Sequence, residues 1–142
     1  MTLSPSPFSG KEELARERIL DAAFAEIRLQ GFQAASVSAI LAETGLTKGA
    51  LYHYFPGKKA LGLAVVDERV ALALRVGVLD GLSVSANHAR PLDVLLQQLD
   101  QVQGWDEASV RLGCPLNNLM QEMSAVDEDF RLHLTAIVVR WQ

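Results

Sequence analysis

Apolar residues recur every three to four positions along most of the chain, which is the spacing of amphipathic α-helices. The first clear stripe consists of Ile19, Leu20, Ala23, Phe24 and Ile27. A capping sequence, Ser-Gly-Lys-Glu at residues 9–12, precedes this stripe, and Gly31 follows it as a typical helix end. The pattern therefore predicts a first helix that begins after Ser9 and ends near Gly31.

Two short helices are predicted next. Ser36 is a good N-cap for a segment with apolar residues at Val37, Ile40 and Leu41, and this segment ends at Gly45. Thr47 caps a third helix that runs through Phe55, and the dipeptide Pro56-Gly57 stops it. Two short helices joined by a tight glycine turn are the helix-turn-helix arrangement.

The rest of the chain is also predicted to be helical. The segment from Lys58 to Leu79 is apolar on nearly every face, which is typical of a helix inside a bundle. A loop is expected at residues 80–91, and four more helical segments at 92–103, 106–112, 115–124 and from 127 onward. Because no segment alternates apolar and polar residues as a strand does, we expect an all-α fold.

Composition fits a protein with its own hydrophobic core. Apolar residues make up 49% of the 142 positions, and the only cysteine, Cys114, excludes an internal disulfide. We expect two regions, a helix-turn-helix domain at 9–57 and a second helical domain at 58–142. No leader sequence and no uncharged apolar span are evident, so a cytoplasmic location is expected.

Charge is unevenly distributed. The net charge is −4, but residues 1–59 hold seven Lys or Arg against six Asp or Glu, while residues 60–142 hold six against eleven. The stretch Leu46–Leu61 contains three lysines, a histidine and two tyrosines with no acidic residue. A polyanion is therefore attracted to the first half of the chain and repelled by the second.

Helical geometry divides the third helix into two faces. At about 100° per residue, Leu51 and Phe55 share one face, and Gly49 and His53 lie on the opposite one. Small residues on the outward face permit close approach to base edges in a major groove, where Lys48 can reach guanine acceptors and Ala50 a thymine methyl group. The residues expected to contact phosphates are Ser36, Thr47, Tyr52, His53, Tyr54 and Lys58. The alternative is an ordinary solvated helix in which Tyr52 or Tyr54 belongs to the core and only its hydroxyl group reaches water.

The segment Ile19–Val66 resembles the N-terminal module of TetR-type repressors. The resemblance is carried by Gly31-Phe32, by Thr47–Phe55 (TKGALYHYF) and by the spacing of Phe55, Lys58 and Leu61. It implies that eight of the predicted residues occupy the family's DNA-contacting positions: Ser36, Thr47, Lys48, Gly49, Tyr52, His53, Tyr54 and Lys58. The part from Glu68 to Gln142 resembles the family's ligand-sensing domain more loosely, most clearly at Gly113–Leu134.

The resemblance also implies a mechanism. Members of the family bind a palindromic operator as homodimers with recognition helices one DNA turn apart, roughly 34 Å, and a small-molecule effector releases the repressor. The family's sensor domain usually continues with two further helices that form the dimer interface, so the chain is expected to be truncated at its C-terminus. The alternative function is a helical ligand-binding or interaction protein that does not bind DNA.

The effector-binding residues predicted in the second domain are Leu99, Trp105, Cys114 and Asn118. Cys114 precedes Pro115 at a predicted helix start, where a thiol is more acidic and suits a sensor of electrophiles. The alternative is a small buried residue, since a free cysteine commonly packs in a core. The histidines lack metal-ligand spacing, and no nucleophile elbow or phosphate loop is present, so we expect no metal, no cofactor and no enzyme.

Overall fold

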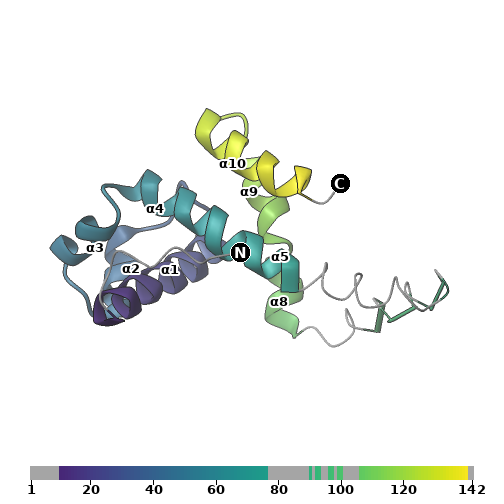
Figure 1. Ribbon diagram of the computed structural model, residues 1–142, viewed down its shortest axis with the longest axis horizontal. Helices are drawn as coiled ribbons and strands as arrows, with labels where there is room; N and C mark the ends of the chain where they lie inside the picture. Colours follow the sequence, from purple (N-terminus) through teal and green to yellow (C-terminus); the bar gives the residue numbers. More distant parts are fainter. Residues whose placement is uncertain are drawn as a thin grey trace. The chain divides into compact units, whose positions relative to one another are not determined.

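The computed structural model of the chain describes residues 10–76, 90, 92–93, 96–97, 99–100 and 106–140. They belong to two compact units, Met1–Val65 and Val66–Gln142. Every regular element in the described ranges is helical and none is a strand, which agrees with the predicted all-α fold. The helices are labelled in Figure 1.

The first unit contains four helices, and the sequence anticipated the limits of the first three and the start of the fourth. They are α1 (Gly10–Gln30), α2 (Val37–Thr44), α3 (Lys48–Tyr54) and α4 (Lys58–Val65). The first of them, α1, contacts the other three, so it is the platform on which the helix-turn-helix is assembled (Figure 1). The predicted cap at Ser9 lies outside the described residues.

The core of this unit comes from the predicted apolar stripe. Ile19, Leu20 and Ala23 of α1 are fully buried, and Ile27 is nearly so. The other three helices contribute Ile40, Leu51, Phe55, Leu61 and Val65. Burying a large aliphatic or aromatic side chain stabilises the folded state by about 1.5–3 kcal/mol. This apolar contact with α1 therefore holds the shorter helices in place.

The predicted caps and turns are confirmed. The Ser36 hydroxyl oxygen accepts the Ala39 N–H at 3.3 Å, and the Thr47 hydroxyl oxygen accepts the Ala50 N–H at 3.1 Å. Between them, Gly45 ends α2 with φ 66°, a left-handed conformation that costs glycine little. Each short helix therefore begins and ends at a residue suited to that position.

The fourth helix belongs with the first unit. Because α4 contacts α1, the compact unit extends to Val65 rather than stopping after residue 57. The domain limits expected from the sequence, 9–57 and 58–142, remain predictions about function, whereas the division at Val65 reflects where the helices touch.

The second unit begins with a departure from the expected helix. A single α-helix was predicted from Lys58 to Leu79, but Val66–Val70 form a π-helix, η1, between α4 and α5 (Ala71–Leu74). The expectation of an uninterrupted α-helix is therefore wrong. The three later helices, α8 (Glu107–Leu112), α9 (Pro115–Met123) and α10 (Glu128–Val139), match the predicted segments.

Contacts of η1 with α9 and α10 organise the second unit. Val66 and Val70 of η1 are fully buried, as are Phe130 and Leu134 of α10. The His133 Nδ1 lies 2.9 Å from both carboxylate oxygens of Asp67, which joins α10 to η1 at the surface. Arg131 hydrogen-bonds to Glu128 one turn earlier, and this bond lowers the pKa of Glu128.

Some sequence expectations concern residues that the structure does not describe. These are the loop at 80–91 apart from Arg90, half of the residues of the helix predicted at 92–103, and Trp105. Over the described part of the chain, every helix is too short or too polar to cross a bilayer.

The anchoring of α3 generates a stability prediction. Leu51 has no exposed surface, so Leu51→Ala leaves a cavity and is expected to lower the free energy of unfolding by about 2–5 kcal/mol. The control is Leu14→Ala on α1, where the side chain is 67% exposed and the expected change stays within about 0.5 kcal/mol. Urea denaturation followed by circular dichroism measures both, and equal effects would contradict the anchoring role.

Candidate nucleic-acid interface

The third helix presents one buried and one exposed face, as its sequence predicts. Leu51 and Phe55 are 0% and 4% exposed. All nine predicted DNA-contacting residues reach the surface. Ser36, Thr47, Lys48, Gly49, Tyr52 and His53 are exposed, and Ala50, Tyr54 and Lys58 are half-buried. The alternative that Tyr52 or Tyr54 belongs to the core does not hold for Tyr52, which is 41% exposed, whereas Tyr54 is half-buried.

The end of α3 is held from α1. The guanidinium carbon of Arg16 lies 5.3 Å from the centroid of the Phe55 ring, a cation–π distance. Phe55 also closes the helix, since its N–H donates to the Leu51 carbonyl at 2.9 Å. The buried anchors of α3 are therefore fixed both by apolar contact and by a charged side chain above the ring.

The exposed aromatic residues of α3 contact their neighbours. Lys48 Nζ lies 5.8 Å from the Tyr52 ring centroid, and the rings of His53 and Tyr54 meet edge to face with centroids 5.0 Å apart. Such contacts limit the side-chain freedom of the outward face. A partially ordered surface loses less conformational entropy when it binds.

The two capping hydroxyls keep a donor for a ligand. A hydroxyl can accept one hydrogen bond and donate another at the same time. Ser36 and Thr47 each accept a backbone N–H of their own helix, so each O–H remains able to donate to a phosphate oxygen. The same residues can therefore begin the helices and position a nucleic-acid backbone.

Gly49 leaves α3 narrow where the helix begins. A Cβ added there meets only the Thr47 hydroxyl oxygen, at 4.0 Å. The folded protein therefore has room for a larger side chain at this position. The absence of a side chain at Gly49 lets an external surface approach the backbone closely.

Lys58 has a partner that the sequence does not reveal. Its Nζ donates to the Gln33 carbonyl at 2.8 Å and lies 5.0 Å from the Phe32 ring centroid. The first residue of α4 is thereby tied to the turn between α1 and α2. An ammonium group has three donors, so the predicted phosphate contact remains compatible with this bond.

Two charged residues of α1, which the sequence reading did not single out, hold the ends of α2. Glu26 Oε1 accepts the Ser36 N–H at 3.2 Å, and Arg18 Nη2 donates to the Thr44 carbonyl at 2.7 Å. No pattern in the sequence distinguishes them from the other charged residues of α1.

The surface charge of the two units differs in sign. Up to Val65 the chain has seven Lys or Arg and six Asp or Glu, and from Val66 on it has six and eleven. Near α3 the charge is more positive, because Leu46–Leu61 contains three lysines and no acid. The exposed face of α3 is thus the part of the chain best suited to an anion.

The structure describes three of the four predicted effector residues, and none of these three lines a described groove of the second unit. Leu99 is exposed, and Trp105 lies outside the described residues. Cys114 is the N-cap of α9 and is exposed, so its interpretation as a buried core residue is wrong. Asn118 Nδ2 donates to the Leu112 carbonyl at 2.7 Å and closes the turn at Gly113. An effector role for these four residues stays a prediction.

The described grooves of the second unit are formed by other residues. Two of them, of about 420 and 380 Å³, share Asp67, Ala71, Ile137 and Arg140 as lining residues from η1, α5 and α10 and the residue after it. Within the described ranges, no group of three or more His, Cys, Asp or Glu is placed to hold a metal ion.

Known proteins resemble most of the chain. An HTH-type transcriptional regulator from the lacX 3′ region of Lactococcus lactis is 38% identical over 118 residues, which cover 82% of this chain and 58% of the relative. The transcriptional regulator AcuR of Cereibacter sphaeroides is 30% identical over 132 residues, covering 91% and 58%. The chain therefore spans little more than half the length of these curated relatives.

Solved structures show the same fold. A TetR transcriptional regulator from Chloroflexus aurantiacus aligns with a TM-score of 0.76 and 30% identity, covering 94% of this chain and 66% of that one. A TetR-family regulator from Agrobacterium tumefaciens aligns with a TM-score of 0.74 at 20% identity, covering 91% and 66%. Residues 19–65 match the family model of bacterial regulatory proteins, tetR family. With its helix-turn-helix, these relatives and this fold, the chain belongs to the TetR family of bacterial regulatory proteins.

Proposed function

We propose that the chain is a DNA-binding transcriptional regulator, of the repressor kind, in which α3 enters the major groove. The observation that carries the proposal is the division of α3 into two faces. Leu51 and Phe55 are buried beneath it, while Lys48, Gly49 and His53 face outward. A short helix with small residues at its leading edge and cationic and hydrogen-bonding groups beside them suits a groove about 12 Å wide.

The contacts have separate roles in this proposal. Lys48 and Ala50 read base edges, and Gly49 permits the approach. The hydroxyl groups of Ser36, Thr47, Tyr52 and Tyr54, together with His53 and Lys58, contact phosphates and set the position of α3. The names of the relatives, which are transcriptional regulators, support this assignment.

The proposal extends to assembly and release. Two copies of the DNA-binding unit bind a palindromic operator with their α3 helices about one DNA turn apart, roughly 34 Å. An effector bound by the second unit favours a conformer with different spacing, which lowers operator affinity. No described contact favours an enzymatic function over this one.

Salt dependence tests the DNA-binding part. Binding to a mixed-sequence duplex should weaken steeply with salt, and Lys58→Gln should reduce the slope of log K against log salt by about 0.9, since it removes the proposed contact of one ammonium group with a phosphate, which displaces a counterion. Arg111→Gln, which removes one exposed positive charge from α8 in the second unit, should leave the slope unchanged. Fluorescence anisotropy measures both, and no binding at any salt concentration would favour the ligand-binding or interaction alternative.

Close approach at Gly49 gives a second test. Gly49→Ala should preserve or raise the stability of the free protein, by up to about 1 kcal/mol, because the methyl group meets open space and alanine favours a helix. Affinity for a duplex selected from random DNA should fall by about tenfold, as a methyl group prevents close contact. Gly10→Ala, at the exposed start of α1, is the control and should change neither. Unchanged affinity for Gly49→Ala would contradict groove entry at this point.

The effector part has its own test at Cys114. Because the thiol is exposed in the folded protein, iodoacetamide should modify it without denaturant, as mass spectrometry can show. If the second unit senses electrophiles, the modification should lower operator affinity by about tenfold, and Cys114→Ser should abolish the response. Modification that leaves operator affinity unchanged would remove the electrophile-sensing hypothesis without affecting the DNA-binding one.

A further inference from the structure

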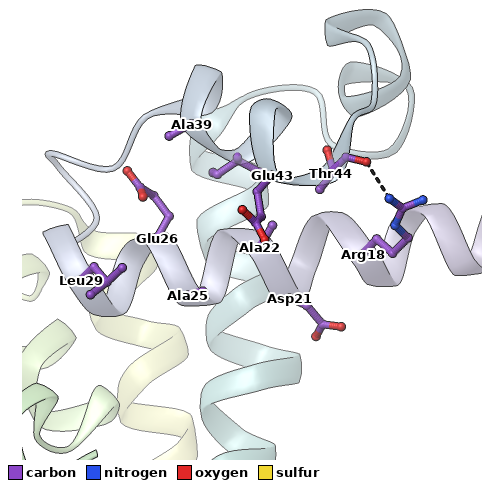
Figure 2. Close-up of a pocket in the computed structure, with 10 residues that line it drawn as sticks. Arg18, Asp21, Ala22, Ala25, Glu26, Leu29, Ala39, Glu43 and Thr44 are labelled. Atoms are coloured by element: carbon purple, nitrogen blue, oxygen red, sulfur yellow. Dashed lines mark hydrogen bonds between the residues drawn. The ribbon is translucent and has the colours of Figure 1, made fainter. Parts of the chain in front are cut away.

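The two ends of α2 are held by oppositely charged side chains of α1. At the N-terminal end the Ser36 N–H donates to Glu26 Oε1, and at the C-terminal end Arg18 Nη2 donates to the Thr44 carbonyl. Figure 2 shows Glu26 and Arg18 rising from α1 toward α2, with the bond from Arg18 to Thr44 drawn as a dashed line. Because Glu26 pairs with the beginning of α2 and Arg18 with its end, the two helices run in opposite directions along this contact.

The signs of these charges match the dipole of α2. The N-terminus of a helix carries partial positive charge and favours a carboxylate, while the C-terminus carries partial negative charge and favours a cation. Glu26 and Arg18 are arranged in this sense. Exchanging them would place each charge at the unfavourable end.

The spacing of the two residues also matches the length of α2. Eight positions separate Arg18 from Glu26, which is about 12 Å along α1 at 1.5 Å per residue. The second helix has eight residues and therefore the same length. One charged side chain thus reaches each end of α2 without a change in the course of either helix.

The interface between the two ends is lined by small residues. A groove of about 520 Å³ runs along it, and its lining includes Ala22 and Ala25 of α1 and Ala39 of α2. Figure 2 shows these alanines among the longer side chains of Asp21, Leu29 and Glu43, which line the same groove. Alanine side chains make few of the interlocking contacts that fix the angle between helices. The hydrogen bonds at the two ends therefore add directional contacts to this packing.

The contact at Thr44 continues toward α3. Thr44 is only 4% exposed, and its hydroxyl donates to the Leu41 carbonyl and accepts the Leu46 N–H. Gly45 follows Thr44 in the left-handed conformation and turns the chain between Thr44 and Leu46. Arg18 therefore holds the residue from which the turn into α3 begins, and Glu26 holds the residue with which α2 begins.

We propose that Glu26 and Arg18 are positioning residues for DNA binding, which fix α2 on α1 from both ends and so set where Ser36 and α3 meet the duplex. The inference rests on the proposed DNA-binding function and adds to it two residues that do not themselves touch DNA. Their effect is transmitted through backbone groups: the Ser36 N–H on one side and the Thr44 carbonyl on the other.

A matched pair of alanine variants separates positioning from charge. Glu26→Ala and Glu43→Ala each remove one carboxylate from the lining of the same groove, but only Glu26 bonds the Ser36 N–H. Removing an acid should by itself favour binding to a polyanion. Glu43→Ala should therefore bind a duplex selected from random DNA as well as the wild type or better. Glu26→Ala should bind it about five- to tenfold more weakly, because an N–H bonded to a charged group loses its acceptor.

Conservative variants provide the rescue. Glu26→Gln keeps an acceptor oxygen and should recover most of the affinity that Glu26→Ala loses. Arg18→Lys keeps a charged donor and should retain more of the wild-type affinity than Arg18→Gln. The salt slope should stay at the wild-type value in Glu26→Ala, since no phosphate contact is lost. A slope that changes, or equal affinities for Glu26→Ala and Glu43→Ala, would overturn the positioning role.

Amide hydrogen exchange tests the same contact without DNA. In Glu26→Ala the amides of Ser36 and Ala39 should exchange about tenfold faster than in the wild type, while Glu43→Ala should leave them unchanged. Unaltered exchange in folded Glu26→Ala, with the fold verified by circular dichroism, would overturn the proposal. A wild-type chain that binds no duplex would overturn the proposed function and this positioning role together, and the exchange rates would still decide whether Glu26 holds α2.

Discussion

The burial of Leu51 and Phe55 beneath α3 is the constraint on which the candidate interface depends. Seven residues are too few for a helix to persist alone in water, so α3 exists because its inner face is packed in the first unit. With Leu51 and Phe55 fixed inward, the helical period directs Gly49 and His53 outward. One apolar contact thus determines both the stability of the helix and the direction of its exposed groups.

The platform for this contact is α1. It supplies the buried stripe under the short helices, the guanidinium group above Phe55, and the two charged groups at the ends of α2. Lys58, at the start of α4, adds a tie to the turn that leads into α2. Apolar burial brings the helices together, and hydrogen bonds from charged side chains add directional contacts between them, because hydrogen bonds depend on direction and apolar contact does not.

The two units differ in charge in a way that fits the proposed DNA-binding function of the first. The acidic second unit is repelled by a polyanion, while the segment around α3 attracts one. This asymmetry favours approach of DNA to the first unit and leaves the second to other ligands. The chain spans 58% of the length of two of its relatives. The contacts described for the second unit are therefore the contacts within the part of the protein that this chain covers.

Much of the first unit could be predicted from local signals. The stripe of α1, the caps at Ser36 and Thr47 and the glycine turn at Gly45 all appear where expected, because caps and turns depend on residues within a few positions of one another. The outward set on α3 was also predictable, since helical periodicity determines which residues share a face. The exposure of Cys114 was harder to predict. Its position at a helix start was evident from the sequence, but its exposure depends on which elements surround it.

The sequence by itself therefore determined the helical elements of the first unit, their caps and the two faces of α3. Only the tertiary structure revealed the π-helix at Val66–Val70, because the apolar pattern of a single turn does not distinguish the α from the π hydrogen-bond pattern. It alone also paired Glu26 with Ser36, Arg18 with Thr44 and Lys58 with Gln33. These bonds join residues ten or more positions apart, and their partners are backbone atoms, which every residue type carries and no sequence pattern marks.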